Sequence, residues 1–136
     1  MPQLATVTLV VADYDEAIAF FVERAGFDLV EDTSLGDGKR WVVVAPRGGA
    51  GARLLLARAV GEEQQGVIGR QAGGRVGFFL QTDDLAGDHA RMAAAGVVFL
   101  EEPRTERYGK VVVFEDLYGN RWDLLEPGLA LQDPGH

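Results

Sequence analysis

The stretch LYGNRWDLLEP at residues 117–127 predicts a tight turn that leads into a short strand. Gly119 and Asn120 both tolerate a positive φ angle, which a sharp reversal between two strands requires. Because side chains alternate along a strand, Trp122 and Asp123 are expected on opposite faces of the sheet. If the face of Asp123 lines a cavity, a carboxylate stands in that cavity.

The composition indicates a globular protein without disulfides. Of the 136 residues, 47% are hydrophobic and 25% are charged, and none is cysteine, which excludes thiolate metal ligands and cysteine nucleophiles. The formal net charge of −8 argues against a nucleic-acid partner. No apolar run approaches the roughly 18 residues of a membrane helix, and the start of the chain is not basic like a signal peptide. We therefore expect a cytoplasmic protein.

The first half of the chain predicts one strand, one helix and three further strands. β-Branched residues at 5–12 indicate the first strand, and Asp13 with Glu16 predicts the start of a helix that ends at Gly26. The three strands that follow are expected at residues 28–32, 39–45 and 53–56.

The second half repeats this pattern. Asp84 follows its counterpart Asp13 by 71 residues, and the valines at 111–113 follow those at 42–44 by 69. A second strand–helix–strands series is expected at residues 75–82, 85–95, 97–100, 110–115 and 122–126, with a polar loop at 101–106. So steady a spacing predicts an internal duplication, and hence an α+β fold of two tandem βαβββ modules.

We expect the two modules to form a single domain, because either half alone would bury too little surface to be stable. Glycine and polar residues at 59–73 indicate a linker, which could hold a short helix or act as a lid. The predicted boundaries are module one at 4–58, the linker at 59–73, module two at 74–127 and a C-terminal tail at 128–136.

Several short motifs carry a family resemblance: VAD at 11–13, AGF at 25–27, DL at 84–85, AGV at 95–97 and DLYGNRWDL at 116–124. With these motifs the chain resembles the vicinal oxygen chelate superfamily over about residues 4–127. That superfamily includes glyoxalase I, extradiol dioxygenases, and fosfomycin- and bleomycin-resistance proteins. The resemblance implies the glyoxalase/bleomycin-resistance/dioxygenase fold, in which the two modules form curved mixed sheets around a cleft. It implies no single activity, because this scaffold hosts many chemistries.

The resemblance also predicts that this chain lacks the family's metal. Metal-using members hold a divalent ion with one residue from each of four strands. Those positions fall here on Thr6, Gly77, Asp123 and either Arg53 or Leu54, and only Asp123 is an ordinary ligand. Since a transition metal needs about three or four protein ligands, we expect no metal and no other cofactor.

The remaining candidates are residues that could contact a small molecule. Asp123 could act as a general base, as a counter-charge for a cation, or as a carboxylate paired with an arginine. Gln81 could offer its amide to a ligand, and the aromatic residues could form pocket walls or simply core. The predicted ligand-binding residues are Thr6, Trp41, Arg53, Phe79, Gln81, Tyr108 and Asp123.

Three functions remain open from the sequence. The first is metal-free binding of a small molecule in the cleft, similar to bleomycin-resistance proteins. The second is an enzyme, a glyoxalase-like lyase or isomerase or a dioxygenase, with altered metal ligands. The third is a dimeric accessory module without a ligand. We also expect a homodimer, because strands at residues 5–12 and 75–82 would leave unpaired edges at the module junction. The resemblance implies that this junction is formed between two chains, and pairing of the modules within one chain is the alternative.

Overall fold

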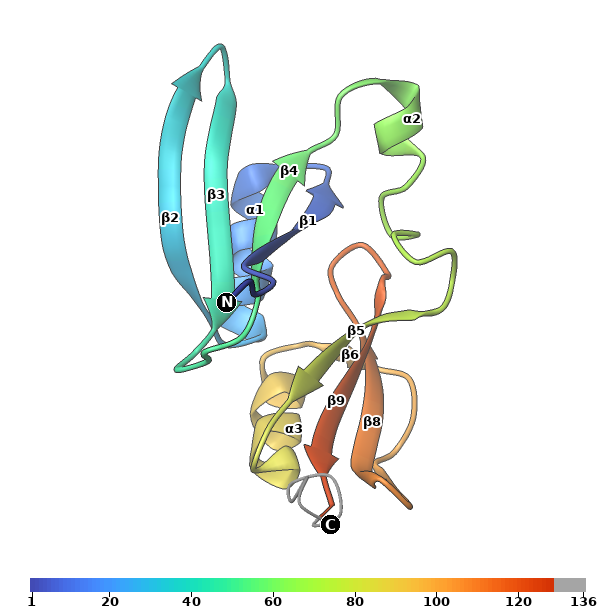
Figure 1. The fold of residues 1–136 in the computed structure, drawn as a ribbon. Helices are drawn as coiled ribbons and strands as arrows, with labels where there is room; N and C mark the ends of the chain where they lie inside the picture. The colour runs from blue at the N-terminus through green and yellow to red at the C-terminus, as the bar shows by residue number, and fades with distance from the viewer. Residues whose placement is uncertain (129–136) are drawn as a thin grey trace. The chain divides into compact units, whose positions relative to one another are not determined.

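The computed structural model describes residues 1–128 and has an α+β fold with two sheets of mixed strands (Figure 1). The chain forms two compact units, unit 1 at Met1–Gln71 and unit 2 at Ala72–His136. In each unit a helix packs on one face of the sheet. Residues 129–136, most of the predicted tail, lie outside the described part. No helix within residues 1–128 is long and apolar enough to cross a membrane.

Unit 1 is a four-stranded sheet with the strand order β1-β4-β3-β2. β1 runs parallel to β4, whereas the other neighbours are antiparallel. A turn of π-helix at Phe20–Arg24 extends the first helix. The elements are β1 (Thr6–Val11), α1 (Tyr14–Ala19), β2 (Phe27–Gly36), β3 (Lys39–Pro46), β4 (Arg53–Arg58) and α2 (Gly61–Gln65).

The predicted limits of the first helix are confirmed for the helical segment that α1 and the π-helical turn form together. The Glu16 N–H donates to the Asp13 carboxylate over 2.9 Å, and Gly26 ends the helical segment at φ 82°. The predicted strand at 28–32 was too short, because β2 continues to Gly36 as one arm of a long hairpin with β3. Asp37, at φ 54°, forms the turn of that hairpin.

Unit 2 is a five-stranded sheet with the order β5-β9-β8-β6, and β7 pairs with β8 beyond this path. The predicted polar loop at 101–106 was partly wrong, because Arg104–Glu106 forms β7 against the start of β8. The elements are β5 (Val76–Gln81), α3 (Leu85–Ala94), β6 (Val98–Phe99), β7 (Arg104–Glu106), β8 (Gly109–Glu115) and β9 (Arg121–Pro127).

The core of unit 2 lies between α3 and the sheet and is built around Trp122. This side chain is 4% exposed, and its ring stacks on Phe78 at 4.5 Å and on Phe114 at 5.7 Å between centroids. Trp122 Nε1 also donates to the buried carboxylate of Asp116. The sequence prediction that Trp122 belongs to the core beneath a helix is therefore confirmed.

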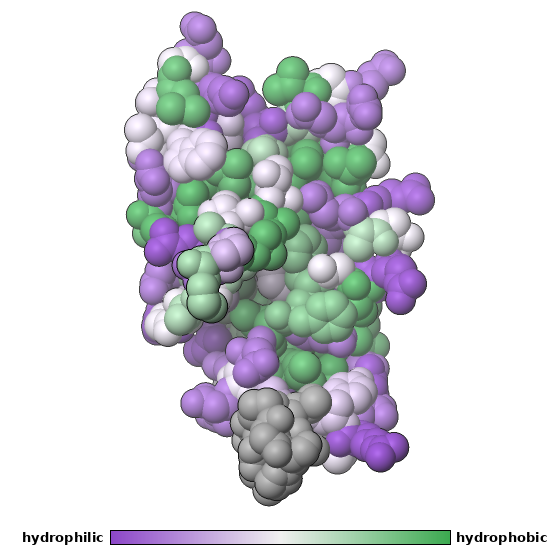
Figure 2. Space-filling view, viewed as in Figure 1, coloured by the Kyte–Doolittle hydropathy of each residue, from purple (hydrophilic) through white to green (hydrophobic). Residues whose placement is uncertain are grey.

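Hydrophobic residues also reach the surface over both units on the side of the molecule shown in Figure 2. Among the described residues, large exposed hydrophobic side chains include Phe79 at 66%, Trp41 at 41% and Tyr108 at 39%. Trp41 belongs to the sheet of unit 1, whereas Phe79 and Tyr108 belong to unit 2. Single exposed apolar side chains are ordinary on protein surfaces.

Candidate functional site

The sheet face of unit 2 that α3 does not cover, called here the helix-free face, carries Asp123. Asp123 on β9 is the cross-strand neighbour of Phe79 on β5 and of Val113 on β8. Side chains of cross-strand neighbours lie on the same face of a sheet. The exposed Phe79 ring therefore lies beside the Asp123 carboxyl, and Trp122 points to the opposite side as predicted.

One oxygen of Asp123 lacks a partner. Within residues 1–128, Oδ1 is shielded from solvent and accepts no hydrogen bond. Burial raises the pKa of the Asp123 carboxyl above its ordinary value. The positive charge of Arg104 lowers this pKa and the negative charge of Glu101 raises it, and the net shift is upward. Buried polar atoms are nearly always paired in native proteins, so Oδ1 is an acceptor without a donor.

Arg104 lies near Asp123 but is held by other groups. Its guanidinium donates to Glu106 at 2.6 Å and to Glu101 at 3.1 Å. Hydrogen bonds to Glu106, Tyr108 and Glu101 raise the pKa of Arg104 further above its ordinary value. The Glu101 carboxylate also accepts the N–H of Val113 at 3.1 Å. This cluster of Glu101, Arg104 and Glu106 holds two negative charges and one positive charge beside Asp123.

The sequence did not reveal this cluster, because only the pairing of β7 with β8 places Arg104 opposite Val111 on the helix-free face. Among the predicted residues, Gln81 pairs with Leu125, two residues beyond Asp123, and so lies further along the same face. Tyr108 joins the cluster through its hydrogen bond with Arg104. Four of the predicted ligand residues thus share the helix-free face or its rim: Phe79, Gln81, Tyr108 and Asp123.

The other three predicted residues lie in unit 1, where only two of them are neighbours. Thr6 on β1 and Arg53 on β4 are cross-strand partners. Trp41 lies towards the other end of β3, two residues before Val43, which pairs with Leu55. Of the two alternatives Arg53 and Leu54, Arg53 is the one that pairs with Thr6, whereas Leu54 pairs with Val7 and is buried, at 8% exposed.

The residues at the family's metal positions do not fit a divalent ion. Gly77 provides no donor, and a Cβ there would come within 2.8 Å of the Ala72 side chain, so a histidine would need the backbone to shift. Within residues 1–128, no group of three or more histidine or carboxylate side chains is placed to hold a metal. Asp123 alone does not supply the ligand count that a transition metal requires.

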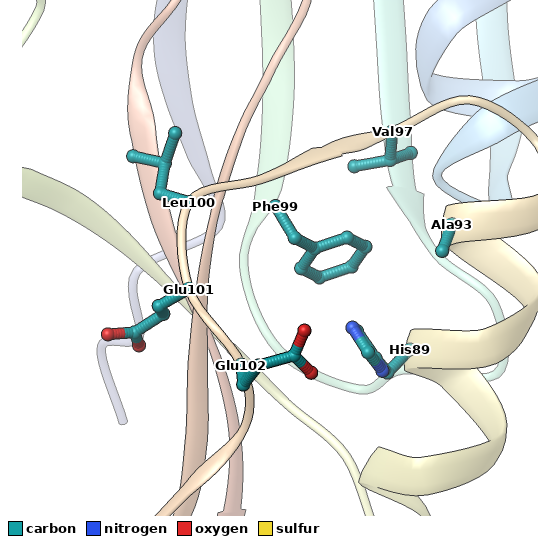
Figure 3. Close-up of a pocket in the computed structure, with 7 residues that line it drawn as sticks. All are labelled: His89, Ala93, Val97, Phe99, Leu100, Glu101 and Glu102. Carbon is teal, nitrogen blue, oxygen red and sulfur yellow. The ribbon is translucent and has the colours of Figure 1, made fainter.

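A hollow lies on the other side of the unit 2 sheet, between α3 and the segment that contains β6 (Figure 3). Its volume is about 590 Å³. The rings of His89 and Phe99 meet edge to face there, with 4.4 Å between their centroids. The lining residues are His89, Ala93, Val97, Phe99, Leu100, Glu101 and Glu102.

Comparison with known proteins identifies the family. The model of the Glyoxalase/Bleomycin resistance protein/Dioxygenase superfamily matches residues 3–124. The chain belongs to this superfamily. A protein from Shewanella frigidimarina is 56% identical over 121 residues, which covers 88% of this chain and 90% of the relative.

Solved structures of this superfamily's fold cover nearly the whole chain as well. UcmS2 is 29% identical with a TM-score of 0.80, and covers 92% of this chain and 98% of its own. TnmS3, described as an antibiotic binding protein from Streptomyces sp. CB03234, is 31% identical with a TM-score of 0.75, and covers 94% of this chain and 98% of its own. The resemblance seen in the sequence motifs is therefore confirmed.

Proposed function

We propose that this superfamily member binds a small organic molecule on the helix-free face of unit 2 without using a metal. The observation that carries the proposal is the shielded Oδ1 of Asp123, which has no hydrogen-bond partner within residues 1–128. An unpaired buried acceptor costs about 1–3 kcal/mol, and a donor group of a ligand would remove this cost.

The surroundings of Asp123 suit a ligand with a flat apolar part and a hydrogen-bond donor. The exposed ring of Phe79 offers the apolar surface next to the carboxyl. The cluster of Glu101, Arg104 and Glu106 adds a net negative charge, which disfavours an anion. Such a ligand would be a neutral or cationic aromatic compound, in line with the antibiotic binding reported in the name of TnmS3.

The proposed function also includes a cellular location, an oligomeric state and further ligand-contacting residues. We place the protein in the cytoplasm. We also propose that it is a homodimer, since β1 and β5 each lie at an edge of their own sheet. In unit 1, Thr6, Arg53 and Trp41 would provide further ligand contacts. No nucleic acid or membrane is part of this function, consistent with the net charge of −8.

A ¹⁹F NMR screen of fluorinated aromatic amines, amides and carboxylates tests this function. We expect amines or amides to bind and Asp123→Asn to weaken them at least tenfold, because the substitution replaces a charged acceptor with an amide. Asp83→Asn, a matched change at an exposed position of unit 2, should leave binding unchanged. Binding of carboxylates alone, with no effect of Asp123→Asn, would refute the proposal.

A lyase or isomerase is the second candidate, because a carboxyl with a raised pKa is suited to accept a proton from a substrate. Metal analysis separates this candidate from a metal-dependent dioxygenase or glyoxalase. We expect purified protein to contain less than a tenth of an equivalent of nickel, zinc, iron or manganese. About one equivalent per chain, lost in Asp123→Ala, would contradict both the binding proposal and a metal-free enzyme.

A further inference from the structure

The hollow between α3 and β6 is separated from Asp123 by the sheet itself. Phe99 at its base packs against Phe114, with 5.7 Å between ring centroids, and Phe114 stacks on Trp122 in the core beneath α3. Asp123 points to the opposite face. The hollow therefore opens on the α3 side of the sheet, and it shares with the cluster beside Asp123 only Glu101, which lines both.

The hollow exists because a small residue faces a large ring. His89 and Ala93 lie one turn apart on the same side of α3, and both line the hollow. Ala93 is too short to reach Phe99, so the space above the ring stays open (Figure 3). The ring itself is held in place by the edge contact with His89 and by Phe114.

The hollow has an apolar floor and an acidic rim. Val97 is 6% exposed, and Leu100 at 42% forms an open apolar wall. The Glu101 carboxylate points away and is engaged by Arg104, whereas the Glu102 carboxylate points towards Phe99 and His89 (Figure 3). Within residues 1–128, Glu102 makes no ion pair or hydrogen bond, so its charge at the rim is uncompensated.

We infer that this hollow is a second ligand site of unit 2, and that it takes a small arylalkyl amine. The aromatic ring would lie on Phe99 and against Val97, and the ammonium group would bind the Glu102 carboxylate beside His89. The hollow is shallow and open to solvent, and its volume of about 590 Å³ leaves room for one small ring that lies on Phe99. A single uncompensated carboxylate on an apolar rim selects a cation and rejects the matching anion.

The test is ¹⁹F NMR titration of the full chain with 4-fluorophenethylamine. The measurements use the Asp123→Asn background, which weakens amine binding at the helix-free face. In that background we expect saturable binding and its loss on adding Ala93→Phe, which fills the hollow. Adding Glu102→Gln should weaken binding about threefold, as an exposed ion pair contributes less than about 1 kcal/mol. Ala94→Phe is the matched control, since Ala94 is exposed on α3 and does not line the hollow. Circular dichroism verifies that each of these variants folds.

In protein with the native Asp123, the two proposals predict two components of amine binding. Ala93→Phe should remove the component at the hollow and keep the component at Asp123, whereas Asp123→Asn should do the reverse. Loss of amine binding in Asp123→Asn together with retention in Ala93→Phe would overturn the inference and support the helix-free face as the amine site. No saturable binding, or equal binding of 3-(4-fluorophenyl)propionate, would also overturn it.

Discussion

At the scale of single residues, Asp116 holds the turn that precedes β9. Its carboxylate is 5% exposed and accepts hydrogen bonds from the Tyr118 N–H, from Asn120 and from Trp122 Nε1. Gly119 takes the positive φ of 93°, whereas Asn120 contributes through these hydrogen bonds instead. The turn is thus determined by one glycine and one buried acceptor.

We predict that Asp116→Ala lowers the free energy of unfolding by about 3 kcal/mol, because it leaves several buried donors without an acceptor. Urea denaturation followed by circular dichroism measures this loss. Asp83→Ala, at an exposed position, should change the free energy by less than about 0.5 kcal/mol. A similar small effect of both substitutions would mean that water replaces the Asp116 carboxylate.

Asp123 is the opposite case, a carboxyl whose charge destabilises the fold. Its pKa is raised above the ordinary value of 3.8, so the folded state binds the proton more tightly than the unfolded state does. Stability therefore falls as the pH rises from 3.8 through the raised pKa. We predict that Asp123→Asn raises the free energy of unfolding by roughly 1 kcal/mol at pH 7.

Below the ordinary pKa, both side chains are neutral and the advantage of Asp123→Asn should disappear. Urea denaturation of the two proteins from pH 3 to pH 8 measures this difference. An advantage that does not change with pH would show that the Asp123 charge is not its cause. Greater stability together with lost ligand binding would identify Asp123 as a residue kept for function.

At the scale of elements, the outer edge of β1 is partly covered by one side chain. The Gln71 amide accepts the Val10 N–H at 3.2 Å and donates to the Thr8 carbonyl at 2.8 Å. These two backbone groups point away from β4 because β1 is the last strand of its sheet. Gln71 thus makes the hydrogen bonds that a neighbouring strand would make at this point.

We predict that Gln71→Ala speeds hydrogen exchange at the Val10 amide at least fivefold and lowers the free energy of unfolding by about 1 kcal/mol. Native-state exchange measured by NMR tests the first effect. Gln65→Ala, on the exposed helix α2, serves as the control. Unchanged protection of Val10 in Gln71→Ala would show that another group protects this edge.

At the scale of the whole molecule, β5 is an edge strand in unit 2, and β1 is an edge strand in unit 1 that Gln71 covers only at Thr8 and Val10. Exposed edges favour pairing between chains, and a two-fold dimer is the commonest arrangement. We predict a homodimer at micromolar concentration. Sedimentation velocity should give about twice the chain mass of 14.7 kDa, whereas a species at 14.7 kDa would contradict the prediction.

What the sequence determined by itself was local or repeated along the chain. The cap at Asp13, the turn before β9 and the opposite directions of Trp122 and Asp123 follow from short-range rules on hydrogen bonding and alternation. The duplication predicted the two mixed sheets, since equal spacing implies equal elements. The family followed from the same motifs.

What only the tertiary structure decided depends on contacts between distant residues. Strand pairing places Arg104 near Asp123, selects Arg53 over Leu54 as the partner of Thr6, and leaves Oδ1 of Asp123 without a donor. The hollow above Phe99 likewise depends on how α3 packs beside β6. Register and packing are set by the sum of many long-range contacts, and no short stretch of sequence contains them.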